Sequence, residues 1–329
     1  MKSFLLTSTL LLLSSQAYSI DTEQAGVRAF IDEMVSEHEF DRQFLIETLS
    51  KAERKQNILD AISRPAEKTL TWGEYRKIFI TPERIKAGAD FCRENSDMLE
   101  SIAASSGVPI EILVGIIGVE TYYGRITGGY RVLDALSTLA FHYPPRSAFF
   151  RKELKQYLLL VREESMSAEE PTGSYAGAMG RPQFMPSSFR AYAVDSTGDG
   201  KRDIWNNWTD VAGSVANYFN AHGWKSGEPV AAPATLGASW RGPTPKPANT
   251  LKAKKTVGSL SKKGVMFSTD LPAEAKAELL TYENEDEFER WVAFHNFFVI
   301  TRYNRSVMYA LAVHQLGQEI ALAIENDAD

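Results

Sequence analysis

Glu120 carries the ionisable group best placed for chemistry, because it lies near the end of an apolar run, PIEILVGIIGVETYYG (109–124). The proline that opens this run suits the first turn of a helix, and the glycine that closes it suits the position just past the end. Ile116, Ile117 and Tyr123 lie one turn from Glu120, and nearly every face is apolar, so we expect a buried helix. Burial and the negative end of the helix dipole both favour the neutral carboxyl. A protonated carboxyl can serve as a general acid near neutral pH; the alternative is a helix-terminal glutamate that points into water.

Two further segments could hold a ligand near such an acid. SYAGAMGRPQFMPSSF (174–189) surrounds Ser174 and Gln183 with glycines and prolines. Glycines allow close backbone approach and the two polar side chains can bind hydroxyls and amides, although the same composition is typical of a structural loop. WVAFHNFFVITRYNRSVMY (291–309) combines many aromatic side chains with Asn304. Such a set suits sugar rings, but an aromatic stripe is more often part of a core.

The segment DSTGDGKRDIWNNWTD (195–210) resembles the start of an EF-hand calcium loop, in which hard oxygen ligands converge on the cation. Loop positions one, three, five and six carry the expected residue types: Asp195, Thr197, Asp199 and Gly200. Position twelve is Asn206 where a bidentate Glu is expected, and Asp210 is the next carboxylate that could close the site. We therefore predict a metal loop; the alternative is a charged turn capped by its own aspartates.

Several other chemistries are disfavoured by residue type and spacing. The five histidines are scattered and form no helical zinc pair, and no G-x-S-x-G elbow is present. The single cysteine, Cys92, falls within a helical pattern and suits a small buried hydrophobe, and it leaves no partner for an internal disulfide. With a formal net charge of −6 and no basic run, a nucleic-acid partner is not expected.

Residues 1–19, MKSFLLTSTLLLLSSQAYS, have the build of a secretory signal peptide. Lys2 precedes a short apolar stretch, and small residues precede a cut after Ser19. The apolar stretch is too short for a membrane-spanning helix, although an uncleaved anchor is the alternative. No cysteine follows the cut to accept a lipid, so we expect no membrane anchor after cleavage.

The remaining chain reads as a mainly α, α+β protein with four regions. Helical patterns occupy an N-terminal region (20–70), including one pattern over 44–63, and a central region (71–225). Within the central region, Thr71 and Glu74 form a capping box, and Thr81-Pro82 starts a helix through residue 106. Prolines and short β-rich pieces then indicate a small inserted β unit (226–290), and a C-terminal segment (291–329) returns to the helical core.

Taken together, GVETYYG, SYAGAMGRPQFMPSSF, DSTGDGKRDIW, GSVANYFNAHGW and ITRYN resemble the lytic murein transglycosylase B family, in order from Trp72 to the C-terminal helix. The resemblance implies a periplasmic enzyme that cuts the β-1,4 bond between N-acetylmuramic acid and N-acetylglucosamine in peptidoglycan. It also implies a lysozyme-like catalytic core over 71–225, a helical domain and a small β domain. Peptidoglycan glycan strands are the expected partner, and cell-wall synthesis enzymes are candidate partners.

The resemblance assigns the single catalytic glutamate to Glu120. It places the glycan-cleft residues at Tyr75, Arg146, Ser174, Gln183, Tyr218, Tyr303, Asn304 and Tyr309. It places the ligands of a structural cation, Ca²⁺ or Na⁺, at Asp195, Thr197, Asp199, the backbone carbonyl of Lys201, and Asp210. No organic cofactor is implied.

Two departures from the family pattern carry expectations. The best-known family member carries a lipid-anchoring cysteine after its signal, and this chain has none, so we expect a soluble periplasmic form. At Pro145-Arg146, where members often carry a basic pair, one contact to the stem peptide or glycan is expected to be weaker.

Ordinary glycosidases use two carboxylates, whereas this sequence offers one well-placed acid. We therefore expect Glu120 to protonate the leaving oxygen and then to take the proton of the muramic acid C6 hydroxyl, which closes a 1,6-anhydro ring without water. Two alternatives remain open. One is a hydrolytic muramidase that uses a second acid such as Asp134, and the other is a non-catalytic, calcium-stabilised peptidoglycan-binding protein.

Overall fold

One of the helical patterns predicted in the N-terminal region is interrupted by a strand in the structure. The computed structural model describes residues 18–63, 70–285 and 287–328, so most of the predicted signal peptide lies outside the described residues. A short strand pair interrupts the helical pattern predicted over 44–63, because the backbone N–H groups of Glu53 and Lys55 donate to the side chains of Asp134 (2.8 Å) and Thr138 (3.0 Å). The elements are β1 (Tyr18–Ser19), α1 (Ala25–His38), α2 (Arg42–Ser50), β2 (Glu53–Arg54) and α3 (Gln56–Ile62).

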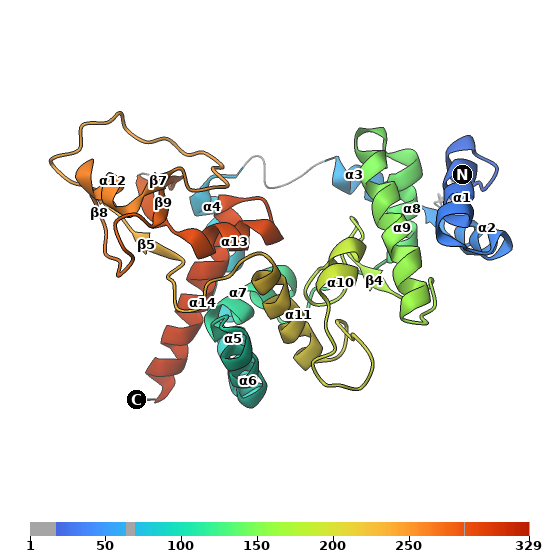
Figure 1. The fold of residues 1–329 in the computed structure, drawn as a ribbon, viewed down its shortest axis with the longest axis horizontal. Coiled ribbons are helices and arrows are strands. Elements are labelled where there is room, and N and C mark those ends of the chain that lie inside the picture. The colour runs from blue at the N-terminus through green and yellow to red at the C-terminus, as the bar shows by residue number, and fades with distance from the viewer. Residues whose placement is uncertain (1–17, 64–69, 286, 329) are drawn as a thin grey trace, which may run out of the picture.

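A helical domain forms where these N-terminal helices meet helices from the middle of the chain (Figure 1). Phe30 of α1 packs edge-on against Phe141, with ring centroids 5.8 Å apart. The sequence pattern assigns these middle helices to the predicted central region (71–225). In the structure they pack against the helices of the predicted N-terminal region (20–70). They are α8 (Val132–His142), a 3₁₀ turn (Pro144–Arg146), α9 (Ser147–Glu163) and α10 (Pro186–Tyr192).

The core that holds Glu120 is built from helices on both sides of the β insert (Figure 1). The capping box predicted at Thr71 and Glu74 is present. The helix predicted from Thr81 to residue 106 is two helices, because Asn95 leaves the helical conformation (φ −127°). The core helices are α4 (Trp72–Phe79), α5 (Pro82–Glu94), α6 (Ser96–Ser106), α7 (Ile110–Thr121), α11 (Trp208–Ala221), α13 (His295–Tyr303) and α14 (Val307–Ala328).

Helices α7 and α14 pack antiparallel at unusually short range. A Cβ on Gly115 would lie 2.4 Å from the carbonyl oxygen of Val313, and a Cβ on Gly317 would lie 2.2 Å from that of Glu111. Side chains larger than hydrogen at either glycine would therefore separate the two helices. This close crossing brings the C-terminal end of α7 beside the N-terminal end of α14, where the site lies.

The β insert is a four-stranded antiparallel sheet in the order β5-β10-β9-β7, with Trp291 opposite Leu280 in the register. It has its own small apolar cluster, including Leu260, Val292 and Phe294. The last strand ends at Ala293, three residues past the predicted end of the insert. Its elements are β5 (Ala231–Pro233), β6 (Thr235–Leu236), β7 (Lys255–Thr256), α12 (Val257–Lys262), β8 (Val265–Met266), β9 (Lys276–Glu283) and β10 (Phe288–Ala293).

Helix α14 is long and apolar enough to cross a membrane over Val307–Asp327. About three fifths of that window (61%) is buried inside the protein, as expected of a core helix. Within the described residues, the only other stretch that reaches this apolar length is α6 with α7, which is bent by 115° between the two helices. The apolar character of α14 is thus explained by its packing against α7 and α5.

Candidate active site

Glu120 lies on the last turn of α7, one residue before the helix ends at Thr121. Tyr122 and Tyr123 then adopt left-handed conformations (φ 50° and 57°), which are costly for residues other than glycine. The Thr121 hydroxyl donates to the carbonyl of Arg181 (3.0 Å) and accepts from the N–H of Gly124 (3.2 Å). The helix therefore ends earlier than predicted, in a strained turn tied to the 174–189 segment.

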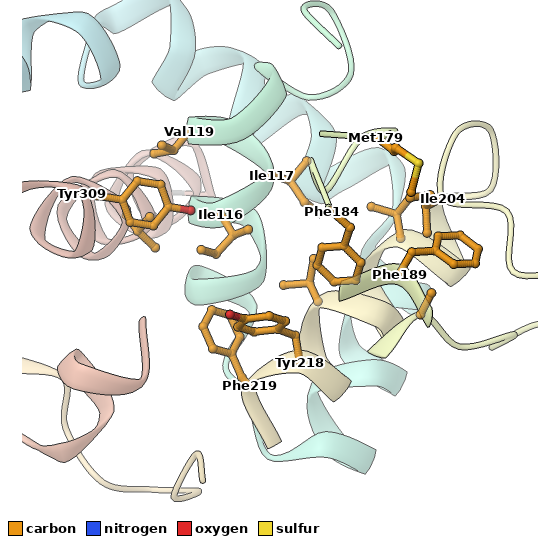
Figure 2. Packing of buried hydrophobic residues seen from close by; sticks show 14 of the residues in the cluster. Ile116, Ile117, Val119, Met179, Phe184, Phe189, Ile204, Tyr218, Phe219 and Tyr309 are labelled. Atoms are coloured by element: carbon orange, nitrogen blue, oxygen red, sulfur yellow. The ribbon is translucent and has the colours of Figure 1, made fainter. Parts of the chain in front are cut away.

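The Glu120 carboxyl is half-buried and receives a hydrogen bond from Tyr309. The Tyr309 hydroxyl lies 2.5 Å from Oε1 of Glu120, and the Tyr309 side chain is 2% exposed. Figure 2 shows the Tyr309 ring beside α7, next to Ile116 and Val119. The prediction of apolar surroundings for this acid is met on the α7 side, and the sequence pattern gave no sign of the phenol that contacts it.

Tyr218, Tyr303 and Tyr309 form what we call the tyrosine cluster. The rings of Tyr303 and Tyr309 are nearly parallel with centroids 6.5 Å apart, and Tyr218 lies 4.8 Å from Tyr303. Burial, followed by the charge of Glu120, raises the pKa of Tyr303 and of Tyr309 well above the usual phenol value. These phenols stay protonated at neutral pH, so Tyr309 keeps the hydrogen that it donates to Glu120.

Backbone carbonyls hold the other two phenols of the cluster. Tyr303 donates to the carbonyl of Pro182 (2.6 Å) and Tyr218 donates to that of Arg302 (2.7 Å). Phe184 packs against both rings, at 5.8 Å and 5.7 Å. Contacts of Tyr303 and Tyr218 with Pro182 and Phe184 therefore hold the 174–189 segment against the end of α13.

Ser174 and Gln183 shape the loop on which they lie. The Ser174 hydroxyl accepts from the N–H groups of Ala176 (3.3 Å) and Ala178 (3.1 Å). Gln183, at φ 52°, donates to the carbonyl of Thr127 (3.0 Å), just after α7. The structure thus brings Gln183 next to the turn that follows Glu120, and both residues also fit the structural-loop alternative.

The remaining predicted cleft residues are divided between two parts of the fold. Tyr75 is buried on α4, close enough to contribute to the raised pKa of Tyr309. Asn304 directly follows Tyr303 at the end of α13. Arg146 lies in the helical domain, where its guanidinium stacks on Phe149 at 4.6 Å. A role for these residues in glycan binding stays a prediction.

Asp134 has a structural role. Its side chain is buried (2% exposed) and forms a two-pronged ion pair with Arg131, at 2.8 and 2.9 Å. Its sequence context does not distinguish it from a solvated surface residue. In the structure it is buried because its side chain accepts a hydrogen bond from the backbone of β2. It is therefore poorly suited to serve as the second acid of a hydrolytic muramidase.

Cys92 is buried, as the sequence predicts, and burial raises the pKa of its thiol to about 12. The thiol is protonated at neutral pH and unsuited to nucleophilic attack. This agrees with its expected role as a small hydrophobe.

The predicted cation loop is a series of tight turns with Gly198 and Gly200 in left-handed conformations (φ 75° and 86°). Both carboxylate oxygens of Asp195 accept from backbone N–H groups, at 2.6 Å from Gly198 and 2.7 Å from Gly200. Asp199 accepts from the N–H of Lys201 (2.9 Å). These are the contacts of the self-capped turn that was the alternative to metal binding.

Asp210 is fully buried and holds the two ends of this loop together. It accepts from the N–H groups of Ser196 (2.9 Å) and Asp203 (3.0 Å). No cluster of three acidic, histidine or cysteine side chains suited to a metal occurs among the described residues. The oxygen donor set fits a hard cation, provided that Asp195 and Asp199 turn from the backbone toward it.

The family model of the transglycosylase SLT domain matches residues 22–318, and the chain belongs to this family. The chain is 44% identical over 307 residues to the membrane-bound lytic murein transglycosylase B of Escherichia coli K12, covering 91% of this chain and 83% of that protein.

Solved structures agree with this assignment. The soluble lytic transglycosylase SltB1 of Pseudomonas aeruginosa, in its catenated form, shares 48% identity, with a TM-score of 0.84 over 91% of this chain and 98% of that chain. Escherichia coli Slt35 in complex with calcium shares 41% identity, with a TM-score of 0.83 over 94% and 97%. The mainly α, lysozyme-like fold expected from the sequence is confirmed.

Proposed function

We propose that this protein is a lytic transglycosylase that cleaves the β-1,4 bond between N-acetylmuramic acid and N-acetylglucosamine in peptidoglycan and leaves 1,6-anhydromuramic acid ends. The observation that carries the proposal is the half-buried Glu120 at the end of α7, held by the Tyr309 hydroxyl, in a chain whose family match runs from residue 22 to 318. A family member, SltB3 of Pseudomonas aeruginosa (28% identical, TM-score 0.77 over 91% of this chain and 80% of that one), was solved with NAG-anhNAM-pentapeptide.

Glu120 first donates its proton to the glycosidic oxygen, and the bond from that oxygen to C1 of muramic acid breaks. The carboxylate then removes the proton of the C6 hydroxyl, whose oxygen forms a new bond to C1 within the same sugar. This returns the proton to Glu120 and consumes no water. The attack gains the advantage of a tethered reactant. The acetamido group of the substrate can stabilise the electron-poor C1 between the two steps.

Tyr309 can assist Glu120 in both proton transfers. Its hydroxyl is a fixed donor at 2.5 Å, so it orients the carboxyl before the first proton transfer. It also stabilises the carboxylate that exists between the two transfers, because a hydrogen bond to the charged form favours that form. Because the Tyr309 side chain is buried, the low local dielectric strengthens this contact.

The mass of the products tests the reaction type. Digestion of isolated sacculi is expected to release disaccharide peptides lighter by one water than hydrolysis products, as read by mass spectrometry. Products of the heavier, reducing-end mass would support the hydrolytic muramidase instead. Absence of any released fragments from folded protein would support the non-catalytic, calcium-stabilised binding protein.

We also propose that the 195–210 loop binds Ca²⁺, with Asp195, Thr197, Asp199, the Lys201 carbonyl and Asp210 as ligands. The hard oxygen donors and the calcium complex of Slt35 support this assignment. The cation would cross-link the loop between α10 and α11 and would take no part in the reaction.

Calcium is therefore expected to act on stability. When its free concentration is about a hundred times its dissociation constant, a ligand that binds only the native state raises the free energy of unfolding by about 2.7 kcal/mol. For a protein of this size, that corresponds to a rise of about 5–10 °C in melting temperature. Thermal unfolding with Ca²⁺, Na⁺, Mg²⁺ or a chelator measures it, and Asp199→Asn should remove the rise. Loss of turnover in chelator with an unchanged melting temperature would contradict a structural ion.

For location, we propose export by the N-terminal signal and a soluble periplasmic form. The short apolar stretch near the N-terminus and the burial of α14 in the core support this reading. The Escherichia coli relative is named as membrane-bound, so fractionation of cells with and without high salt separates the two cases.

A further inference from the structure

A groove of about 680 Å³ lies beside the tyrosine cluster, between the end of α13 and the long segment that joins β6 to β7. Its charged wall is made by Lys252, Lys254, Arg302 and Arg305, and we call it the basic groove. No acidic side chain lines it in the described part of the chain. It is distinct from the position of Arg146, which lies in the helical domain.

The cations of the basic groove lack carboxylate partners. In the part of the chain that the structure describes, none of the four forms an ion pair, whereas the adjacent Lys255 pairs with the buried Glu278. Between Glu228 and Asp270 the sequence has seven Lys and Arg residues and no Asp or Glu, in a chain of net charge −6. Such a concentration of one sign attracts anions locally against the overall charge.

Hydrogen bonds fix the walls of the groove, and one wall borders the tyrosine cluster. Asn249 donates to the carbonyl of Arg305 (2.8 Å) and accepts from the N–H of Val307 (2.9 Å), which fixes the long segment to the start of α14. Tyr218 donates to the carbonyl of Arg302, and the positive charge of Arg302 acts on the Tyr218 phenol. His222, which lines the groove, stacks on the Tyr218 ring with centroids 4.1 Å apart, so the basic groove borders the tyrosine cluster.

We propose that the basic groove binds the carboxylates of the peptide substituents that peptidoglycan carries on its muramic acid residues, an inference that rests on the proposed function. Sugar rings offer hydroxyls and amides, which suit the aromatic and amide groups around Glu120. The substrate's negative charge resides mainly in the peptides, whose terminal carboxyl groups are ionised at neutral pH. The groove thus makes the enzyme favour glycan that still bears peptides.

The test compares two substrates and two matched variants. Lys252→Gln/Lys254→Gln removes two charges from the groove, and Lys262→Gln/Lys263→Gln removes two from the same insert outside it. Each is assayed on peptide-bearing glycan and on glycan stripped by an amidase, which keeps only the lactyl carboxylate. We expect the groove variant to lose about three- to tenfold in kcat/KM on the peptide-bearing substrate alone, the scale of two exposed ion pairs. The control should match wild type on both substrates.

Equal losses of the groove variant on both substrates, or equal losses in the control, would overturn the proposal. A second measurement is independent of turnover. Peptides released by the amidase are titrated by NMR into Glu120→Gln protein with and without the two groove substitutions, and weaker binding is expected without the lysines. If wild type cleaves neither glycan while the peptides still bind through the groove, the proposed reaction fails and the groove assignment stands.

Discussion

Glu120→Gln is expected to lower the rate of fragment release from sacculi by at least about 10²–10⁴-fold, because it removes the only group that transfers protons in the proposed cycle. The amide has the shape of the carboxyl and can still accept from Tyr309 at the same place. Substrate binding should therefore survive. Product release from purified sacculi, followed by mass spectrometry, measures the rate, and a pull-down with the same sacculi measures binding.

Tyr309→Phe is the matched variant, since it keeps the acid and removes its donor. It should fall between wild type and Glu120→Gln, with a loss of about tenfold expected from one charge-assisted hydrogen bond. Both proteins should melt within a few degrees of wild type. Turnover of Glu120→Gln close to that of wild type would remove this residue from the chemistry, and with it the single-carboxyl mechanism.

Features that depend on neighbours in the sequence could be predicted. The capping box at Thr71 and Glu74 needs three residues of spacing, and the burial of α7 follows from its uninterrupted apolar composition. Glu120 could be singled out for the same reason, because an acid at the end of such a helix conflicts with its surroundings. The oxygen-rich turns at 195–200 are likewise local.

Features decided by distant contacts could not be predicted from pattern. The helical pattern over 44–63 is broken because backbone N–H groups within it donate to the side chains of Asp134 and Thr138, which lie about eighty residues away. Tyr309 is 189 residues from Glu120, and only the family resemblance placed the two in one site. The left-handed Tyr122 and Tyr123 that end α7 early have no composition signal at all.

Gly115→Ala is expected to destabilise the protein by about 1–3 kcal/mol, because overpacking a filled interface forces its parts to separate. The new Cβ would lie 2.4 Å from the carbonyl oxygen of Val313, and neither backbone can yield without moving a helix. The melting temperature should fall by about 3–10 °C. Separation of α7 from α14 should also lengthen the contact between Glu120 and Tyr309, so activity measured below the melting transition should fall as well.

Gly26→Ala is the control, because this glycine of α1 has no atom within 4 Å of its Cβ position. The same substitution there should be neutral or stabilising by up to about 1 kcal/mol, since alanine is the better helix former. Differential scanning calorimetry of the two variants separates packing from propensity. If Gly115→Ala has the same melting temperature as Gly26→Ala, α7 and α14 do not approach each other this closely in solution. The helix packing that brings Tyr309 to Glu120 would then be absent.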